Sequence, residues 1–183
     1  MPRYEEILNE WFFLLLPKGQ SFDEFERVDA EPDRKKTENV LGQMERELPR
    51  TFGNIFHVSR FEYSPVVLSQ VDDSLTVETV SGWIDESDPN DPNNVFKLTV
   101  SEIAVYFGEL LLRTRRGEWR YARFPNYFQS SVAIGETAIH VFDSVIKRCS
   151  SDYRHETLMS KWGTFQRLVA VPEAQGSEPA LPS

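Results

Sequence analysis

Histidine and cysteine, the side chains that most often hold metals or act as nucleophiles, are scarce in this chain. There are three histidines, His57, His140 and His155, and one cysteine, Cys149. No histidine has a second ligand at the short spacing that zinc sites use, so the sequence predicts no metal site and no cofactor. Cys149 would need His140 or His155 as its base. It falls on the apolar face of a helical segment, where a free cysteine behaves as a buried hydrophobe.

Two carboxylates, Glu102 and Glu109, are the best candidates for acid–base chemistry. Their spacing places them on the same side of a helix, about 10 Å apart, which is long for glycoside hydrolysis. An ion pair between Glu109 and Arg113, four residues later, is the simpler interpretation. An enzyme would have to assemble its site from scattered residues such as Glu102, Glu109, His140 and Arg123, and it would show a deep pocket where they converge. The sequence contains no nucleophile elbow, phosphate loop or dinucleotide fingerprint.

An acidic loop is the first candidate for a binding surface. Its carboxylates are Asp85, Glu86, Asp88 and Asp91. The loop lacks the glycine and the closing glutamate of a calcium loop, and two prolines interrupt it, so we expect a solvated loop that contacts a protein partner.

A basic stretch with interleaved aromatic residues is the second candidate. It contains Arg113, Arg115, Arg116, Arg120 and Arg123, together with Trp119 and Tyr121. Arginine beside aromatic side chains suits a partner surface or a phosphate-bearing ligand. Positive charge at the end of a helix also offsets the helix dipole, and strand arginines often cover a sheet face. The structural interpretation is the simpler one, but this stretch is still the best functional candidate in the chain, and we predict partner contacts at Arg115, Arg116, Trp119 and Arg120.

Composition limits the class of protein. The chain has 183 residues, of which 40% are hydrophobic, so it can bury a sizeable core. A net charge of −9 disfavours binding to nucleic acid or to an anionic membrane. The single cysteine, the acidic start of the chain and an apolar run too short to span a bilayer predict a cytoplasmic protein. We expect one domain over 1–171 and a disordered tail over 172–183.

Apolar periodicity predicts the elements that must position these residues. Helical spacing occurs over 4–16, 32–48, 75–84, 99–114, 142–149 and 155–169, and strand-like segments over 65–68, 118–124, 130–134 and 137–141. The helix over 99–114 is apolar on nearly every side, which indicates a buried helix. Gly108 within it indicates a close approach by another backbone. The predicted fold is α+β: a small antiparallel sheet packed against a central buried helix, with several flanking helices.

One segment resembles a known group of proteins. Tyr106, Gly108 and Glu109 in one helix, Trp119 at the start of a strand, and Phe142 and Lys147 in a later helix follow a shared order. In this respect residues 74–148 are similar to small bacterial domains of unknown function, some of which serve as immunity proteins beside polymorphic toxins. The resemblance implies a helix packed on a small antiparallel sheet and brings no catalytic motif.

These observations favour a non-enzymatic protein-binding module. Its specific form would be an immunity protein that neutralises a toxin by occlusion, with a basic toxin domain as the partner. The alternatives are an enzyme with a scattered site, or a structural subunit that forms a homodimer through the aromatic N-terminal helix around Trp11.

Overall fold

The computed structural model describes residues 1–12 and 31–169, which form helices around a three-stranded sheet. The helices are α1 (Tyr4–Trp11), α2 (Glu31–Ile55), α3 (Pro65–Ser74), α4 (Val77–Asp85), α5 (Val95–Thr114), the 3-10 helix η2 (Tyr127–Gln129), α6 (Val141–Arg148) and α7 (Leu158–Val169). The strands are β1 (Glu118–Arg120), β2 (Ser131–Ile134) and β3 (Thr137–Ile139). The predicted α+β class is confirmed.

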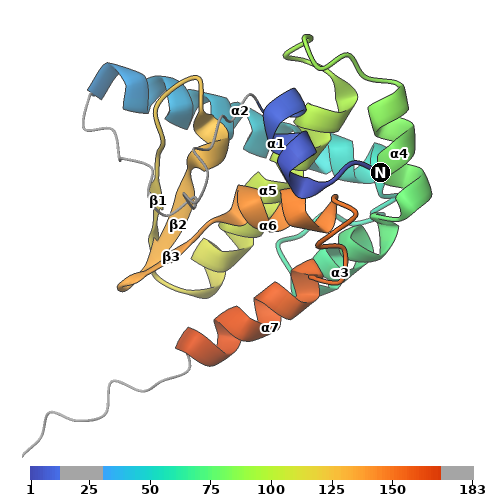
Figure 1. Ribbon diagram of the computed structural model, residues 1–183. Coiled ribbons are helices and arrows are strands. Elements are labelled where there is room, and N and C mark those ends of the chain that lie inside the picture. The colour runs from blue at the N-terminus through green and yellow to red at the C-terminus, as the bar shows by residue number, and fades with distance from the viewer. Residues whose placement is uncertain (13–30, 170–183) are drawn as a thin grey trace, which may run out of the picture.

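Helix α5 is the centre of the fold. Asn94 caps its N-terminus by accepting a hydrogen bond from the Lys97 amide at 2.8 Å. Phe107 is 1% exposed and Leu111 is fully buried. Helices α2, α3, α4 and α6 and strand β2 all contact α5, and Figure 1 shows the other helices arranged around it. The predicted buried helix is confirmed. The side chains that another molecule could contact therefore lie on the elements that surround α5.

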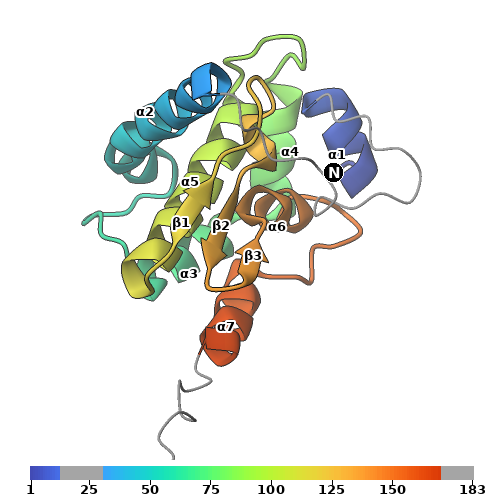
Figure 2. The ribbon, with the colours of Figure 1, turned by 90° about the vertical axis from the view of Figure 1, so that its left-hand side faces the viewer.

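The sheet is antiparallel in the order β1-β2-β3. Val132 of β2 pairs with Trp119 of β1 on one side and with Ile139 of β3 on the other. Gly135 turns the β2–β3 hairpin with a φ of 58°, a left-handed conformation that glycine adopts without steric cost. In Figure 2 the sheet lies in front of α5, with β1 running along that helix.

Strand β1 is shorter than the predicted strand over 118–124. Beyond Arg120 the backbone of Ala122 is bonded by side chains instead of by a neighbouring strand. The Ala122 amide donates to Ser130 Oγ at 3.0 Å, and its carbonyl accepts from Thr37 Oγ1 at 2.9 Å. Because these bonds satisfy the backbone, the chain leaves the ladder there.

Helix α2 continues through Pro49, where the sequence predicted its end. Proline in a helix interior removes one backbone hydrogen bond and costs about 3 kcal/mol. Leu48 and Phe52 on either side are both fully buried. The Phe52 ring packs at 4.7 Å from Tyr106, so burying these large side chains offsets the cost of the proline.

The segment predicted as a strand over 65–68 is the first turn of α3. Ser64 caps this helix by accepting a hydrogen bond from the Val67 amide at 3.3 Å, and Pro65 occupies the first position. Valines at 66 and 67 favour a strand by local propensity. The cap and the burial of Leu68 on the helical face override that preference. Thr76 caps the next helix by accepting a hydrogen bond from the Thr79 amide at 3.1 Å.

The N-terminal helix ends at Trp11, and residues 13–16 of the predicted helix lie outside the described residues. Trp11 packs 4.9 Å from Phe96, and Phe12 packs 5.2 Å from Phe128. Both side chains are buried within their own chain. Trp11 is therefore not available to form a homodimer interface. The predicted tail over 172–183 lies outside the described residues.

Candidate functional site

The acidic loop predicted from the sequence connects α4 to α5 and is held by its own polar side chains. The Asp88 carboxylate accepts hydrogen bonds from the Asn90 amide at 2.9 Å and from Asn90 Nδ2 at 3.1 Å. The Asp91 carboxylate accepts from the Asn93 amide at 2.8 Å. Such local bonds fix a turn without help from the rest of the protein.

Residues at the start of α5 attach this loop to the core. Asn94 Nδ2 donates to the carbonyls of Asp88 and Asp91, at 3.1 and 2.6 Å. The buried Lys97 extends its ammonium group to within 3.4 Å of the Pro89 carbonyl. Burial lowers the pKa of Lys97, and the Asp91 carboxylate partly opposes this shift. Bonds within the chain itself therefore hold this loop in place.

The four carboxylates of the loop divide into two pairs with different electrostatic roles. Asp88 and Asp91 lie just before the N-terminus of α5, where negative charge is favourable. Asp85 is the last residue of α4 and Glu86 is its C-cap, where negative charge opposes the helix dipole. Both Asp85 and Glu86 are exposed. These two residues therefore add charge to the surface at some cost in stability.

The basic residues predicted as a partner surface lie at the other end of α5. Arg115 and Arg116 follow the C-terminus of this 20-residue helix and are exposed. At 1.5 Å per residue, they are about 30 Å from the acidic loop at its N-terminus. Figure 1 shows the loop before α5 and the turn after it at opposite ends of the molecule. The structure therefore does not bring the two candidate surfaces together. Arg120, in strand β1, is half-buried and so less accessible than Arg115 and Arg116.

Trp119, the remaining predicted partner residue, packs inside the protein. A Cβ atom at Gly108 would lie 2.3 Å from Cζ2 of this indole, so the close approach at Gly108 is by a side chain and not by a backbone. The indole Nε1 donates to Glu109 Oε1 at 2.9 Å. Glu109 in turn lies 3.8 Å from Arg113, as the sequence predicted. These contacts give Trp119 a packing role, while its contact with a partner stays a prediction.

The same network contains two residues that sequence reasoning missed, Glu45 of α2 and Tyr63 from the α2–α3 connection. Glu45 Oε1 accepts from Arg113 Nη2 at 3.2 Å and from the Tyr63 hydroxyl at 3.1 Å. Arg113 also lies 4.0 Å above the Tyr63 ring. Burial and the nearby Glu45 carboxylate raise the pKa of Tyr63. No sequence spacing links these residues, because they come from separate elements.

The scattered residues of the enzyme hypothesis contact different parts of the protein. Burial raises the pKa of Glu102, and a hydrogen bond from Thr51 of α2 opposes the shift. Burial also raises the pKa of Glu109, which bonds to Trp119. Among the described residues there is no group of three or more histidine, cysteine or acidic side chains that could hold a metal ion.

The structure places Cys149 in the core, as predicted from its helical face. Burial raises the pKa of its thiol to about 12, which leaves the reactive thiolate scarce at neutral pH. We expect the native protein to react with Ellman's reagent at pH 8 at least about 100-fold more slowly than the urea-unfolded chain, because reaction requires opening of the core. Equal rates for the native and unfolded chains would contradict the buried position.

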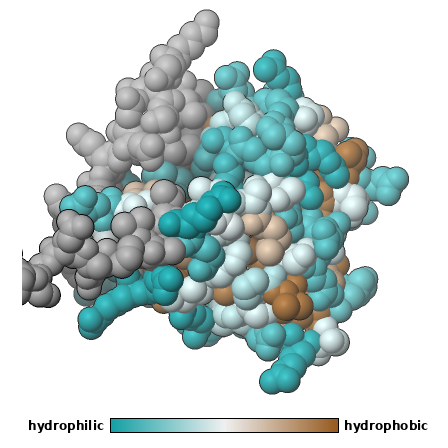
Figure 3. Space-filling view, turned by 90° about the horizontal axis from the view of Figure 1, so that it is seen from below, coloured by the Kyte–Doolittle hydropathy of each residue, from teal (hydrophilic) through white to brown (hydrophobic). Residues whose placement is uncertain are grey.

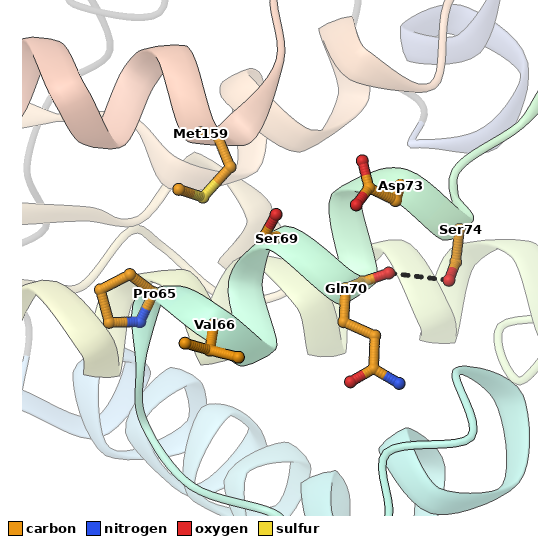
Figure 4. Close-up of a pocket in the computed structure, with 7 residues that line it drawn as sticks. All are labelled: Pro65, Val66, Ser69, Gln70, Asp73, Ser74 and Met159. Carbon is orange, nitrogen blue, oxygen red and sulfur yellow. Dashed lines mark hydrogen bonds between the residues drawn. The ribbon is translucent and has the colours of Figure 1, made fainter.

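A groove of about 670 Å³ lies between α3 and α7. Its lining residues are Pro65, Val66, Ser69, Gln70, Asp73, Ser74 and Met159, and Figure 4 shows Met159 of α7 facing the α3 residues. Figure 3 shows the side of the molecule that carries these helices, with a few apolar residues among polar ones. The groove contains neither Glu102, Glu109, His140 nor Arg123, so it is not the pocket that the enzyme hypothesis requires.

Comparisons with known protein families, with characterised proteins and with solved structures found no match to this chain. Within 1–12 and 31–169, no helix combines the length and the apolar character needed to cross a membrane.

Proposed function

We propose that this protein is a binding module whose acidic loop contacts the basic face of a protein partner. The observation that carries the proposal is the ordered loop that presents Asp85 and Glu86. Internal hydrogen bonds fix the loop at Asp88 and Asp91, so little conformational entropy is lost when a partner binds. Val95, 43% exposed at the start of α5, provides an apolar contact beside the charges.

The placement of charge supports a binding role over a stabilising one. Asp85 and Glu86 lie at the negative end of α4, and the last turn of that helix has no basic residue. Each such carboxylate costs about 0.3–1 kcal/mol of stability. Charge that costs stability at a fixed, exposed position is typical of functional surfaces.

The specific form that we propose is the neutralisation of a toxin by occlusion, with a basic toxin domain as the partner. The net charge of −9 supports it, because an acidic protein attracts a basic partner and associates with it rapidly at low salt. The resemblance of residues 74–148 to immunity domains is the reason for preferring a toxin to other basic proteins.

Neutralising the two outer carboxylates is expected to stabilise the protein. The variant D85N/E86Q should gain about 0.6–2 kcal/mol in the free energy of unfolding, because it removes two negative charges from the C-terminal end of α4. The control is E78Q, which removes a carboxylate from the first turn of the same helix and should lose stability. Urea unfolding at low ionic strength measures both changes. A loss of stability in D85N/E86Q would contradict the charge argument.

The binding role is tested with the native partner. The immobilised protein is used to isolate a partner, at low salt, from a lysate of the cells that produce it. The affinity of the protein for the purified partner is then measured. We expect a basic protein whose affinity falls at least about tenfold with D85K/E86K and declines steeply with added salt. The matched control is E5K/E10K, which makes the same charge change on the exposed face of α1. An equal loss with both variants would contradict a specific role for the loop.

The immunity form makes a further demand on this partner. Its toxic or enzymatic activity should be inhibited by the wild-type protein at equimolar concentration and restored by D85K/E86K. If the protein binds this partner but does not inhibit any activity of it, the protein is a binding module and the immunity role is contradicted.

A further inference from the structure

Two basic segments that are far apart in the sequence lie together on one surface. Arg34 of α2 lies above the ring of Tyr121, with its Cζ atom 5.8 Å from the ring centroid. Lys36 lies above the ring of Phe124, with its Nζ atom 5.9 Å from the ring centroid. Figure 2 shows the N-terminal end of α2 beside the segment that follows β1. We call the surface formed by Arg34, Lys36, Tyr121 and Phe124 the α2–hairpin surface.

A buried hydrogen bond fixes this arrangement. Thr37 Oγ1 donates to the Ala122 carbonyl at 2.9 Å, and Thr37 is fully buried. On a helix with 3.6 residues per turn, Arg34 and Lys36 point to either side of Thr37. The two cations therefore straddle the chain segment 121–124 at positions that the backbone determines.

Arg34 and Lys36 have no carboxylate partner among the residues that the structure describes. Neither Arg34 nor Lys36 forms a salt bridge within the part of the chain that the structure describes, although the protein has 29 acidic residues against 20 basic ones. Phe124 is 38% exposed and presents an apolar ring beside Lys36. An arginine and a lysine on the surface beside an exposed aromatic ring resemble the energetically important centres of protein interfaces.

We propose that the α2–hairpin surface binds an acidic segment of a protein, in which carboxylates flank an apolar side chain. The carboxylates would pair with Arg34 and Lys36, and the apolar side chain would pack on Phe124. This surface has the opposite charge to the acidic loop, so it would contact a different segment or a different partner. Because the acidic loop plays no part in it, the two proposals stand or fall separately.

The charge distribution favours an acidic peptide over a nucleic acid. A nucleic acid carries phosphates along its whole length, and those beyond the surface would meet a protein with a net charge of −9. A short acidic segment ends where the surface ends.

The test is fluorescence anisotropy with a labelled peptide of about 12 residues in which glutamate and aspartate alternate with leucine. We expect salt-dependent binding to the wild-type protein that weakens at least about tenfold in R34E/K36E and about threefold or more in F124A. The matched control is R46E/R60E, which makes the same change in net charge at exposed positions outside this surface, Arg46 ten residues farther along α2 and Arg60 in the connection to α3. This control should change the affinity by less than about threefold.

Three outcomes would overturn the proposal. One is an equal loss of affinity in R46E/R60E and R34E/K36E, which would indicate a response to net charge alone. Another is tighter binding of a labelled oligothymidine of the same length, and the third is no peptide binding at low salt. Because R34E/K36E could disturb α2, circular dichroism and thermal unfolding accompany each variant, and R34Q/K36Q repeats the measurement without new negative charge.

Discussion

Replacing Arg148 with methionine is expected to lower the free energy of unfolding by about 3–5 kcal/mol. Arg148 Nε donates to Asp72 Oδ1 at 2.6 Å, and Nη2 donates to the Asp72 carbonyl at 2.8 Å. Asp72 is 4% exposed, and its other carboxylate oxygen accepts a hydrogen bond from the Met159 amide at 3.1 Å. The substitution therefore leaves a buried carboxylate without its counter-charge. Urea unfolding at pH 7 measures the loss.

Two further variants identify the cause of this loss. Arg50→Met removes an exposed pair with Glu47, whose charged atoms are 2.9 Å apart, and should cost less than about 1 kcal/mol. The double variant D72N/R148M should recover much of the stability, because the uncompensated charge is gone while the side-chain oxygen can still accept from Met159. A loss of stability in R148M as small as that in Arg50→Met would show that the buried pair does not hold α3, α6 and α7 together.

Replacing Gly108 with alanine is expected to destabilise the protein by about 2–4 kcal/mol, although alanine is the better helix former. The new Cβ atom would lie 2.3 Å from Cζ2 and 2.4 Å from Cη2 of Trp119. The indole must move, and its hydrogen bond to Glu109 is then broken, which leaves a half-buried carboxylate without its donor. Thermal and urea unfolding measure the change.

A matched glycine separates helix propensity from crowding. Gly82 lies inside α4, and a Cβ atom there would meet nothing within 4 Å. Gly82→Ala should therefore stabilise the protein by about 1 kcal/mol. In a Trp119→Leu background, Gly108→Ala should change from destabilising to nearly neutral or stabilising, because the crowding atoms are removed. A destabilising effect of the same size in both backgrounds would refute the contact.

One candidate surface could be predicted from local signals in the sequence, and the other depends on tertiary contacts. The acidic loop was predictable, because aspartate, asparagine and proline in succession specify an exposed turn. The hydrogen bonds by which Asn94 and Lys97 hold this loop could not be predicted from the sequence. The α2–hairpin surface could not be predicted, because its cations and its aromatic rings are more than eighty residues apart and only the fold brings them together.

The sequence by itself determined the central helix, the β2–β3 hairpin with Gly135, and helix α6 with Cys149 on its buried face. These elements have strong periodicity or a residue that only one conformation suits, so local chemistry is sufficient. Only the tertiary structure decided that α2 passes through Pro49 and that the valines near Pro65 form a helix. In both places the burial of Phe52 or Leu68 outweighs a local preference, and burial depends on residues that are distant in the chain.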